Sequence, residues 1–152
     1  MTMVQMVSLE LAFSYGGQPQ VINPVILRDE EEREVILVDC GYPDFEALIE
    51  EAAGRHNITP ADLTRVIVTH HDLDHMGSLA ALKENYPRIE IIAHEIEKPY
   101  IEGRRKSLRL EQAESTFDAL PEAAKAGAAQ FIRALKAVKP APVDRTVRDG
   151  ER

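Results

Sequence analysis

Side chains that bind metal ions crowd into one short segment, Thr69-His70-His71-Asp72-Leu73-Asp74-His75-Met76-Gly77. Five of the six residues from His70 to His75 carry an imidazole or a carboxylate, and both groups suit zinc, iron and manganese. The segment follows the apolar run Val66–Val68 and precedes a helix that we expect from about Ser78 to Asn85. It therefore lies at the carboxyl end of a predicted strand, where sites gather in open α/β sheets.

A tight loop in this segment would let two carboxylates and two imidazoles point inward together. These are His70, Asp72, Asp74 and His75. Gly77 has no side chain and would allow the backbone to approach closely where the next helix begins. A cation held there lowers the pKa of a coordinated water to ~7, which supplies hydroxide at neutral pH. The alternative interpretation, an ordinary polar loop with Asp74 as a helix N-cap, stays open.

The flanking sequence predicts strands and helices in alternation after an opening pair of strands. Apolar side chains at the odd positions from Val7 to Phe13 have the period of a half-buried strand, and the run Val21–Leu27 bends at Asn23-Pro24. Further strands are predicted at Val35–Val38, Val66–Val68 and Ile89–Ile92, the first two buried on both faces by their composition, and possible at Val143–Val147. Helices are predicted over Phe45–Ala53, Ser78–Asn85, Glu95–Glu102 and Pro121–Val138. This order indicates an α/β layered domain.

Composition and charge exclude several classes of protein. The 152 residues carry 44% hydrophobic side chains, enough for one folded domain over residues 1–152. A formal net charge of −8 argues against a nucleic-acid partner. No apolar run approaches the ~20 residues that a bilayer span needs, and no Lys or Arg occurs in Met1–Leu11, so we expect a cytoplasmic protein without a membrane partner. Cys40 is the single cysteine, which excludes a disulfide within the chain.

The pattern Thr-His-x-Asp-x-Asp-His-x-Gly, from Thr69 to Gly77, resembles the metal-binding signature of the metallo-β-lactamase-fold hydrolases. Val35–Gly41 resembles the strand of that family that ends in an Asp and a Gly, and Ile91–Glu95 resembles the strand after the motif helix. The resemblance implies an α/β (α+β) fold, the αββα sandwich. This chain would contain only the N-terminal half, with a helical insertion at about residues 108–138.

The same resemblance implies a two-metal site and assigns residues to it. His70 and Asp72 match the positions that bind the first metal, and Asp74 and His75 match the second pair. Asp74 would also orient the attacking hydroxide, so it is the catalytic candidate. Asp39 matches a position beside the metals, from which, like Gly77, it would support the ligands. Zinc is the expected metal, and a carboxylate at Asp72, where the family usually has histidine, makes iron or manganese possible.

The sequence departs from the family in the ligands that should come from a second half. His94 is the only histidine after the cluster, and it matches a helix-start position of the family rather than one of those ligands. His71 falls at a variable position of the signature, so it is not a ligand candidate. We therefore expect a truncated chain with weak or partial metal binding. Half a sandwich would expose a sheet face, so we also expect a homodimer or larger assembly that covers it.

The function that the resemblance implies is metal-dependent hydrolysis. Metal-activated hydroxide would attack an ester, thioester, lactone or phosphodiester in an unidentified small-molecule substrate, with activity impaired in the truncated chain. Two alternatives stay open. One is a non-catalytic, self-associating truncated domain, and the other is a relative of the diiron oxygen or nitric-oxide reductases, which only Asp72 suggests.

Overall fold

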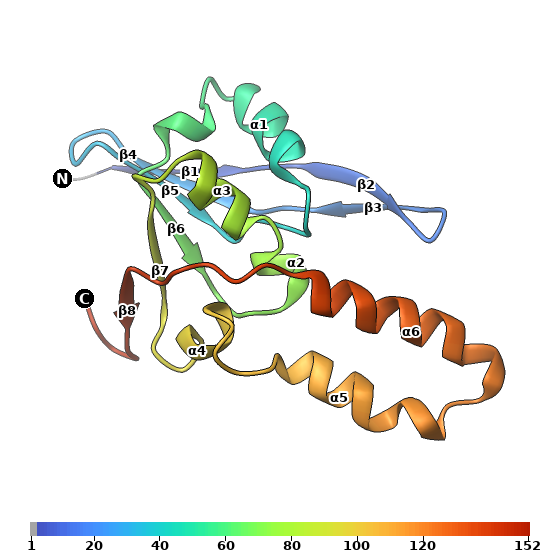
Figure 1. Ribbon diagram of the computed structural model, residues 1–152. Helices are drawn as coiled ribbons and strands as arrows, with labels where there is room; N and C mark the ends of the chain where they lie inside the picture. The colour runs from blue at the N-terminus through green and yellow to red at the C-terminus, as the bar shows by residue number, and fades with distance from the viewer. Residues whose placement is uncertain (1–2) are drawn as a thin grey trace.

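The computed structural model of the protein describes residues 3–152. Its main sheet has six strands in the order β1-β4-β5-β6-β7-β8 (Figure 1). These are β1 (Val4–Ser8), β4 (Val25–Asp29), β5 (Glu34–Val38), β6 (Arg65–Val68), β7 (Glu90–His94) and β8 (Arg145–Val147). The pairs β1–β4 and β4–β5 are antiparallel, whereas β5 through β8 run parallel. Parallel neighbours need long crossovers, and these crossovers carry the helices.

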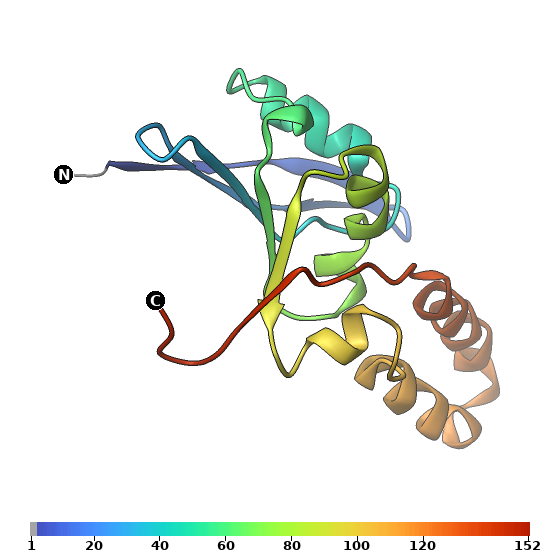
Figure 2. The ribbon, with the colours of Figure 1, turned by 60° about the vertical axis from the view of Figure 1, so that its left-hand side comes forward.

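Helices α1 (Glu46–Gly54) and α3 (Leu79–Asn85) lie on one face of the sheet, as Figures 1 and 2 show. The other helical segments are η1 (Pro60–Asp62), α2 (Leu73–Met76), α4 (Lys98–Ile101), α5 (Leu108–Thr116), η2 (Phe117–Ala119) and α6 (Glu122–Ala137). Helices α5 and α6 form an antiparallel hairpin in the region where the sequence predicts an insertion (Figure 1). None of the helices within residues 3–152 has the length and apolar character needed to span a bilayer.

The alternating apolar residues from Val7 to Phe13 are divided between two sheets. This corrects the prediction that they form a single strand. Strand β1 ends at Ser8, and β2 (Leu11–Tyr15) pairs with β3 (Gln18–Ile22) in a separate antiparallel hairpin. Between them, the backbone N–H of Leu9 donates to the Pro24 carbonyl at 2.8 Å, and the Asn23 side chain donates to the Leu9 carbonyl at 3.0 Å. Both backbone groups of Leu9 are thus satisfied by the bend at Asn23-Pro24. Proline has no N–H to continue a ladder. The segment from β1 to β2 and the segment from β3 to β4 both pass from one sheet to the other at this point.

The core lies between the sheet and helices α1 and α3. Its strand members are fully buried and share one face: Ile26, Leu37, Val66 and Ile91. Ile49 of α1 and Leu79 of α3, both 0% exposed, pack onto this face. One side of each strand therefore supplies the hydrophobic core.

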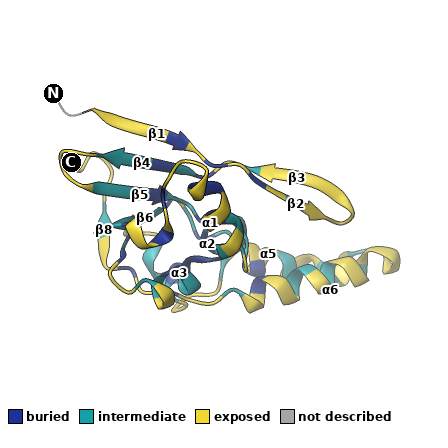
Figure 3. Cartoon of the chain, turned by 90° about the horizontal axis from the view of Figure 1, so that it is seen from above, coloured by how far each residue is buried: buried dark blue, intermediate teal, exposed yellow. Residues whose placement is uncertain are grey.

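The opposite face of the sheet carries no helix of the described part of the chain (Figure 2). Met6, Leu27 and Ile36 lie in register across it, and Met6 is 70% exposed. Figure 3 shows β1 mostly exposed and β4 and β5 mostly of intermediate burial. The predicted burial of Val35–Val38 on both faces is therefore wrong, since only Leu37 of that run is fully buried. The same holds for Val66–Val68, in which Ile67 is only partly buried.

Candidate metal centre

The segment that follows β6 forms a short loop and then the single helical turn α2. Asp72 is the N-cap of α2 in extended backbone conformation, and its carbonyl accepts hydrogen bonds from the N–H groups of His75 and Met76, both at 3.0 Å. The alternative in which Asp74 is the N-cap is wrong, because Asp74 lies inside the turn. The turn places Asp74 and His75 beside each other at the carboxyl end of β6.

The four side chains assigned to metals form two close pairs. The Nε2 atom of His70 lies 3.6 Å from Oδ2 of Asp72, and Nε2 of His75 lies 3.5 Å from Oδ2 of Asp74. The rings of His70 and His75 are themselves 3.9 Å apart between centroids. Two ligands bound to one tetrahedral zinc at 2.0–2.2 Å are about 3.4 Å apart. Each pair therefore has the separation of two ligands that share an ion.

Neither pair is completed by a third ligand. Within residues 3–152, no group of three or more His, Cys, Asp or Glu side chains is gathered so that it could hold a metal ion. Zinc sites use three or four protein ligands. The donors thus fit zinc in chemical type and in pairwise spacing, while each pair supplies two ligands. The assignment of these residues to metals stays a prediction.

Asp39 fixes the orientation of His75. Its Oδ2 atom lies 2.8 Å from Nδ1 of His75, and the same carboxylate accepts hydrogen bonds from the N–H of Thr69 at 2.8 Å and from its hydroxyl at 2.7 Å. A carboxylate partner at Nδ1 assigns the ring proton to that nitrogen and leaves the lone pair on Nε2, toward Asp74. Asp39 has a left-handed backbone with φ of 63°, a conformation that Asp tolerates better than most residues.

The loop after β5 is locked to the junction between α2 and α3. A Cβ atom on Gly77 would lie 2.2 Å from the backbone N of Pro43 and 2.2 Å from the carbonyl carbon of Tyr42. Ser78, which is 1% exposed, donates its hydroxyl proton to the Tyr42 carbonyl at 2.7 Å and accepts from the N–H of Phe45 at 2.8 Å. These contacts hold the Asp39 loop against the turn that carries Asp74 and His75.

Two titratable side chains beside the cluster stay protonated at neutral pH. Burial raises the pKa of the Cys40 thiol, which is 0% exposed and donates to the His75 carbonyl at 3.2 Å. Burial, and then the negative charge of Asp74, raise the pKa of the Tyr42 phenol. Since metals and electrophiles react with the thiolate, Cys40 is a structural residue here.

His71 turns away from the other two histidines of the segment. It is 7% exposed, its Nδ1 atom contacts the Glu97 carboxylate, and its Nε2 atom accepts the N–H of Leu108 at 3.3 Å. Its ring stacks on Tyr100 with 4.2 Å between centroids and 9° between planes. Both ring nitrogens are therefore engaged, one by the N-cap residue of α4 and the other by the first residue of α5.

The contact between Arg109 and Asp72 was not predicted from the sequence. The Nη2 atom of Arg109 lies 3.3 Å from Oδ2 of Asp72, so a guanidinium from α5 reaches a carboxylate of the predicted metal site. The two residues are 37 positions apart, and no local pattern in the sequence links them.

A mixed sheet with paired imidazoles and carboxylates at the carboxyl end of β6 is the arrangement that the signature at Thr69–Gly77 predicts for the metallo-β-lactamase fold. The family model described as the metallo-beta-lactamase superfamily matches residues 17–151, and the chain belongs to this superfamily. The fold and family expected from the signature at Thr69–Gly77 are thereby confirmed.

Known relatives are similar over part of their length. The probable metallo-hydrolase YqjP of Bacillus subtilis is 31% identical over 85 residues, which is 55% of this chain and 26% of that protein. The probable metallo-hydrolase YflN of the same organism is 25% identical over 91 residues, which is 59% of this chain and 34% of that protein. This chain therefore matches only about a quarter to a third of those proteins.

Solved structures show the same fold. A metallo-beta-lactamase family protein from Thermus thermophilus superposes with a TM-score of 0.67 at 19% identity, covering 96% of this chain and 46% of that chain. The subclass B3 metallo-beta-lactamase BJP-1 of Bradyrhizobium japonicum gives 0.61 at 22% identity, covering 86% and 40%. At such identities the likeness concerns the fold alone.

Proposed function

We propose that the protein is a metal-dependent hydrolase of small-molecule esters, thioesters, lactones or phosphodiesters. One observation carries the proposal: Asp39 holds His75 through Nδ1, and the free Nε2 atom lies 3.5 Å from the Asp74 carboxylate. A histidine oriented in this way beside a carboxylate is the arrangement that metal ligands need.

Four side chains of the site would bind metal ions, and one of them would also orient the attacking water. His70 with Asp72, and His75 with Asp74, would hold zinc, with iron or manganese as alternatives. When bound, the metal lowers the pKa of a coordinated water to ~7 and so supplies hydroxide. Asp74, which has a second carboxylate oxygen available, would accept a hydrogen bond from that water and direct it toward the substrate.

Space for a substrate lies directly beside the pair formed by Asp74 and His75. A cavity of about 280 Å³ is lined by Asp39, Asp74 and His75 on one side. Its other side is formed by the bend between β3 and β4, with Ile22, Asn23 and Pro24. A small electrophile in this cavity would touch the Asp74 carboxylate, His75 and the Asp39 carboxylate that orients His75.

The direct test is hydrolysis by the chain after incubation with Zn²⁺, Mn²⁺ or, under anaerobic conditions, Fe²⁺. The substrates are p-nitrophenyl acetate, an acyl thioester, a γ-lactone and bis(p-nitrophenyl) phosphate. We expect turnover above that of the free metal for at least one substrate, loss of that turnover in Asp74→Asn, and retention in Asp118→Asn, which changes an exposed carboxylate of η2. Metal binding without turnover of any of the four, or turnover that Asp74→Asn leaves unchanged, would contradict the proposal.

A second candidate is a non-catalytic domain that acts through self-association. The uncovered sheet face, with Met6 70% exposed, favours it, as does the engagement of Asp72 by Arg109. This candidate predicts self-association in the absence of any metal and no hydrolysis with any metal, so the same substrate panel distinguishes the two functions.

A further inference from the structure

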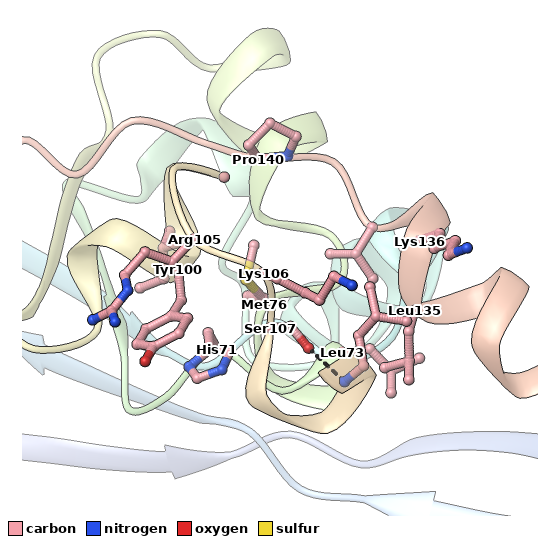
Figure 4. A pocket seen from close by; sticks show the side chains of 14 residues that line it. His71, Leu73, Met76, Tyr100, Arg105, Lys106, Ser107, Leu135, Lys136 and Pro140 are labelled. Atoms are coloured by element: carbon pink, nitrogen blue, oxygen red, sulfur yellow. Dashed lines mark hydrogen bonds between the residues drawn. The ribbon is translucent and has the colours of Figure 1, made fainter. Parts of the chain in front are cut away.

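A second cavity lies on the far side of the 69–77 segment from the paired carboxylates and imidazoles. Its volume is about 400 Å³, and it opens between α2, α4 and the α5–α6 hairpin (Figure 4). Apolar side chains from all four helices line it: Leu73, Met76, Ile101, Leu110 and Leu135. The volume falls within the 300–1,000 Å³ range of small-molecule sites.

This cavity is separate from the predicted metal site. Of the 69–77 segment it is lined by His71, Leu73 and Met76, and by none of the four side chains assigned to metals. His71 forms part of the cavity wall. Its ring is held in one orientation, because it contacts Glu97, Leu108 and the Tyr100 ring. A ligand there would therefore meet a preformed apolar surface rather than a reactive group.

Three cations surround the apolar lining. Figure 4 shows Arg105 beside Tyr100, Lys106 near the middle and Lys136 beside Leu135. The Arg105 guanidinium lies 5.4 Å from the centre of the Tyr100 ring, and Lys106 contacts Glu114 at 3.3 Å. Neither Arg105 nor Lys136 forms an ion pair with any residue from 3 to 152. In a chain with a net charge of −8, this local excess of uncompensated positive charge favours an anion at the mouth.

We propose that this cavity binds a small amphipathic anion, an acyl-type apolar body that ends in a carboxylate. The apolar part would lie on Leu73, Leu110 and Leu135. The positive charges of Arg105, Lys106 and Lys136, which are spread along the rim, would attract the carboxylate to the mouth. The proposal does not depend on the hydrolase proposal, because no metal ligand lines the cavity. Leu73 and Met76 belong to the same helical turn as Asp74 and His75, so the ligand would touch the turn that carries one predicted ligand pair.

The probe for the test is octanoate, titrated into the metal-free chain by calorimetry and compared with octylammonium, which has the same apolar chain and the opposite charge. We expect saturable binding of octanoate and at least ten-fold weaker binding of octylammonium. Lys136→Glu and Arg105→Glu should each weaken octanoate binding about five-fold, the effect of altering an exposed charge contact. Arg133→Glu changes the charge of α6 equally but does not line the cavity, and it should leave octanoate binding unchanged.

Amide chemical shifts locate the bound probe independently of these variants. Octanoate should perturb the amides of Leu73, Leu110 and Leu135, whereas binding to the uncovered sheet face would perturb Met6 and Ile36. The proposal is overturned if octanoate does not bind at millimolar concentration, if octylammonium binds equally well, or if the perturbed amides are those of the sheet face. It is also overturned if Lys136→Glu and Arg105→Glu bind octanoate as tightly as Arg133→Glu does.

Discussion

The guanidinium of Arg109 lies 3.3 Å from the carboxylate of Asp72, so helix α5 contacts the predicted metal site through a cation. The carboxylate of Asp72 also lies 3.6 Å from Nε2 of His70, its expected partner in the first ligand pair. A metal ion and a guanidinium would compete for the same oxygen atoms. The α5–α6 hairpin is therefore coupled to the metal affinity of this pair.

Removing the competing cation should strengthen metal binding. We expect Arg109→Ala to bind Zn²⁺ about five-fold more tightly, because an exposed ion pair is worth up to ~1 kcal/mol and must be broken before Asp72 can bind the ion. A titration against a chromophoric chelator measures the change. Arg104→Ala, which removes an exposed arginine paired with Glu102 at 3.3 Å, should leave the affinity as it is. Equal affinities for Arg109→Ala and the unchanged chain would show that Arg109 does not compete with the metal ion for Asp72.

The hydrogen bond from His75 to Asp39 should matter as much for metal affinity as a ligand does. We expect Asp39→Asn to lower Zn²⁺ affinity about 10- to 100-fold, the usual effect of losing the carboxylate that orients a ligating histidine. Asn tolerates the left-handed backbone that position 39 requires, so the fold should persist. The chelator titration with Asp118→Asn as the matched control tests this, and an affinity equal to that of the control would remove Asp39 from the site.

The backbone approach at Gly77 predicts a large loss of stability on a minimal substitution. In Gly77→Ala, the new Cβ would meet backbone atoms of Tyr42 and Pro43 at 2.2 Å, and backbone cannot move aside as a flexible side chain can. We expect the free energy of unfolding in urea to fall by about 3 kcal/mol or more. Gly127→Ala in α6, where a Cβ meets nothing within 4 Å, should instead add up to ~1 kcal/mol. A loss in Gly77→Ala no larger than the change in Gly127→Ala would mean that the two loops are not locked together.

Local patterns in the sequence identify most elements of this fold but not the way distant ones combine. The helix predicted over Pro121–Val138 corresponds to α6 at Glu122–Ala137, because its apolar spacing and flanking prolines are local signals. The change of sheet at Leu9 was not predictable, because the alternation of apolar residues continues through it. The strand ends there because the backbone of Leu9 bonds to the bend at Asn23-Pro24, which is 14 or more positions away in the sequence.

The candidate site, too, was predictable from local sequence only in part. Asp72, Asp74 and His75 stand in a contiguous signature, and a resemblance between motifs was enough to select them. Arg109 reaches Asp72 only because α5 folds back over the segment. The basic run at Arg104–Lys106 contributes two of the three cations around the second cavity, because the segment between α4 and α5 lies at the rim of that cavity.

The buried Cys40 thiol should make the protein less stable at alkaline pH. Burial raises the pKa of Cys40 in the folded state, whereas the thiol of the unfolded chain loses its proton near pH 8.5. Above that pH the folded state binds one more proton than the unfolded state, so the free energy of unfolding falls by up to ~1.4 kcal/mol per pH unit. Urea unfolding of the unchanged chain and of Cys40→Ala between pH 7 and 9.5 should give the steeper decline in the unchanged chain. Parallel declines would show that the thiol ionises in the folded state.

The uncovered sheet face predicts that this chain associates with itself. Met6, Leu27 and Ile36 form a continuous apolar row across three strands, and water contact of such a row is unfavourable by about 25 cal/mol for each Å². We expect sedimentation velocity to show a dimer or larger species at micromolar concentration. Met6→Lys puts a charge into the row and should shift the equilibrium toward monomer, whereas Met3→Lys adds the same charge at an 84% exposed position before β1 and should leave it unchanged. A monomer at all concentrations, or an equal response to both lysines, would mean that the face is not the contact between copies.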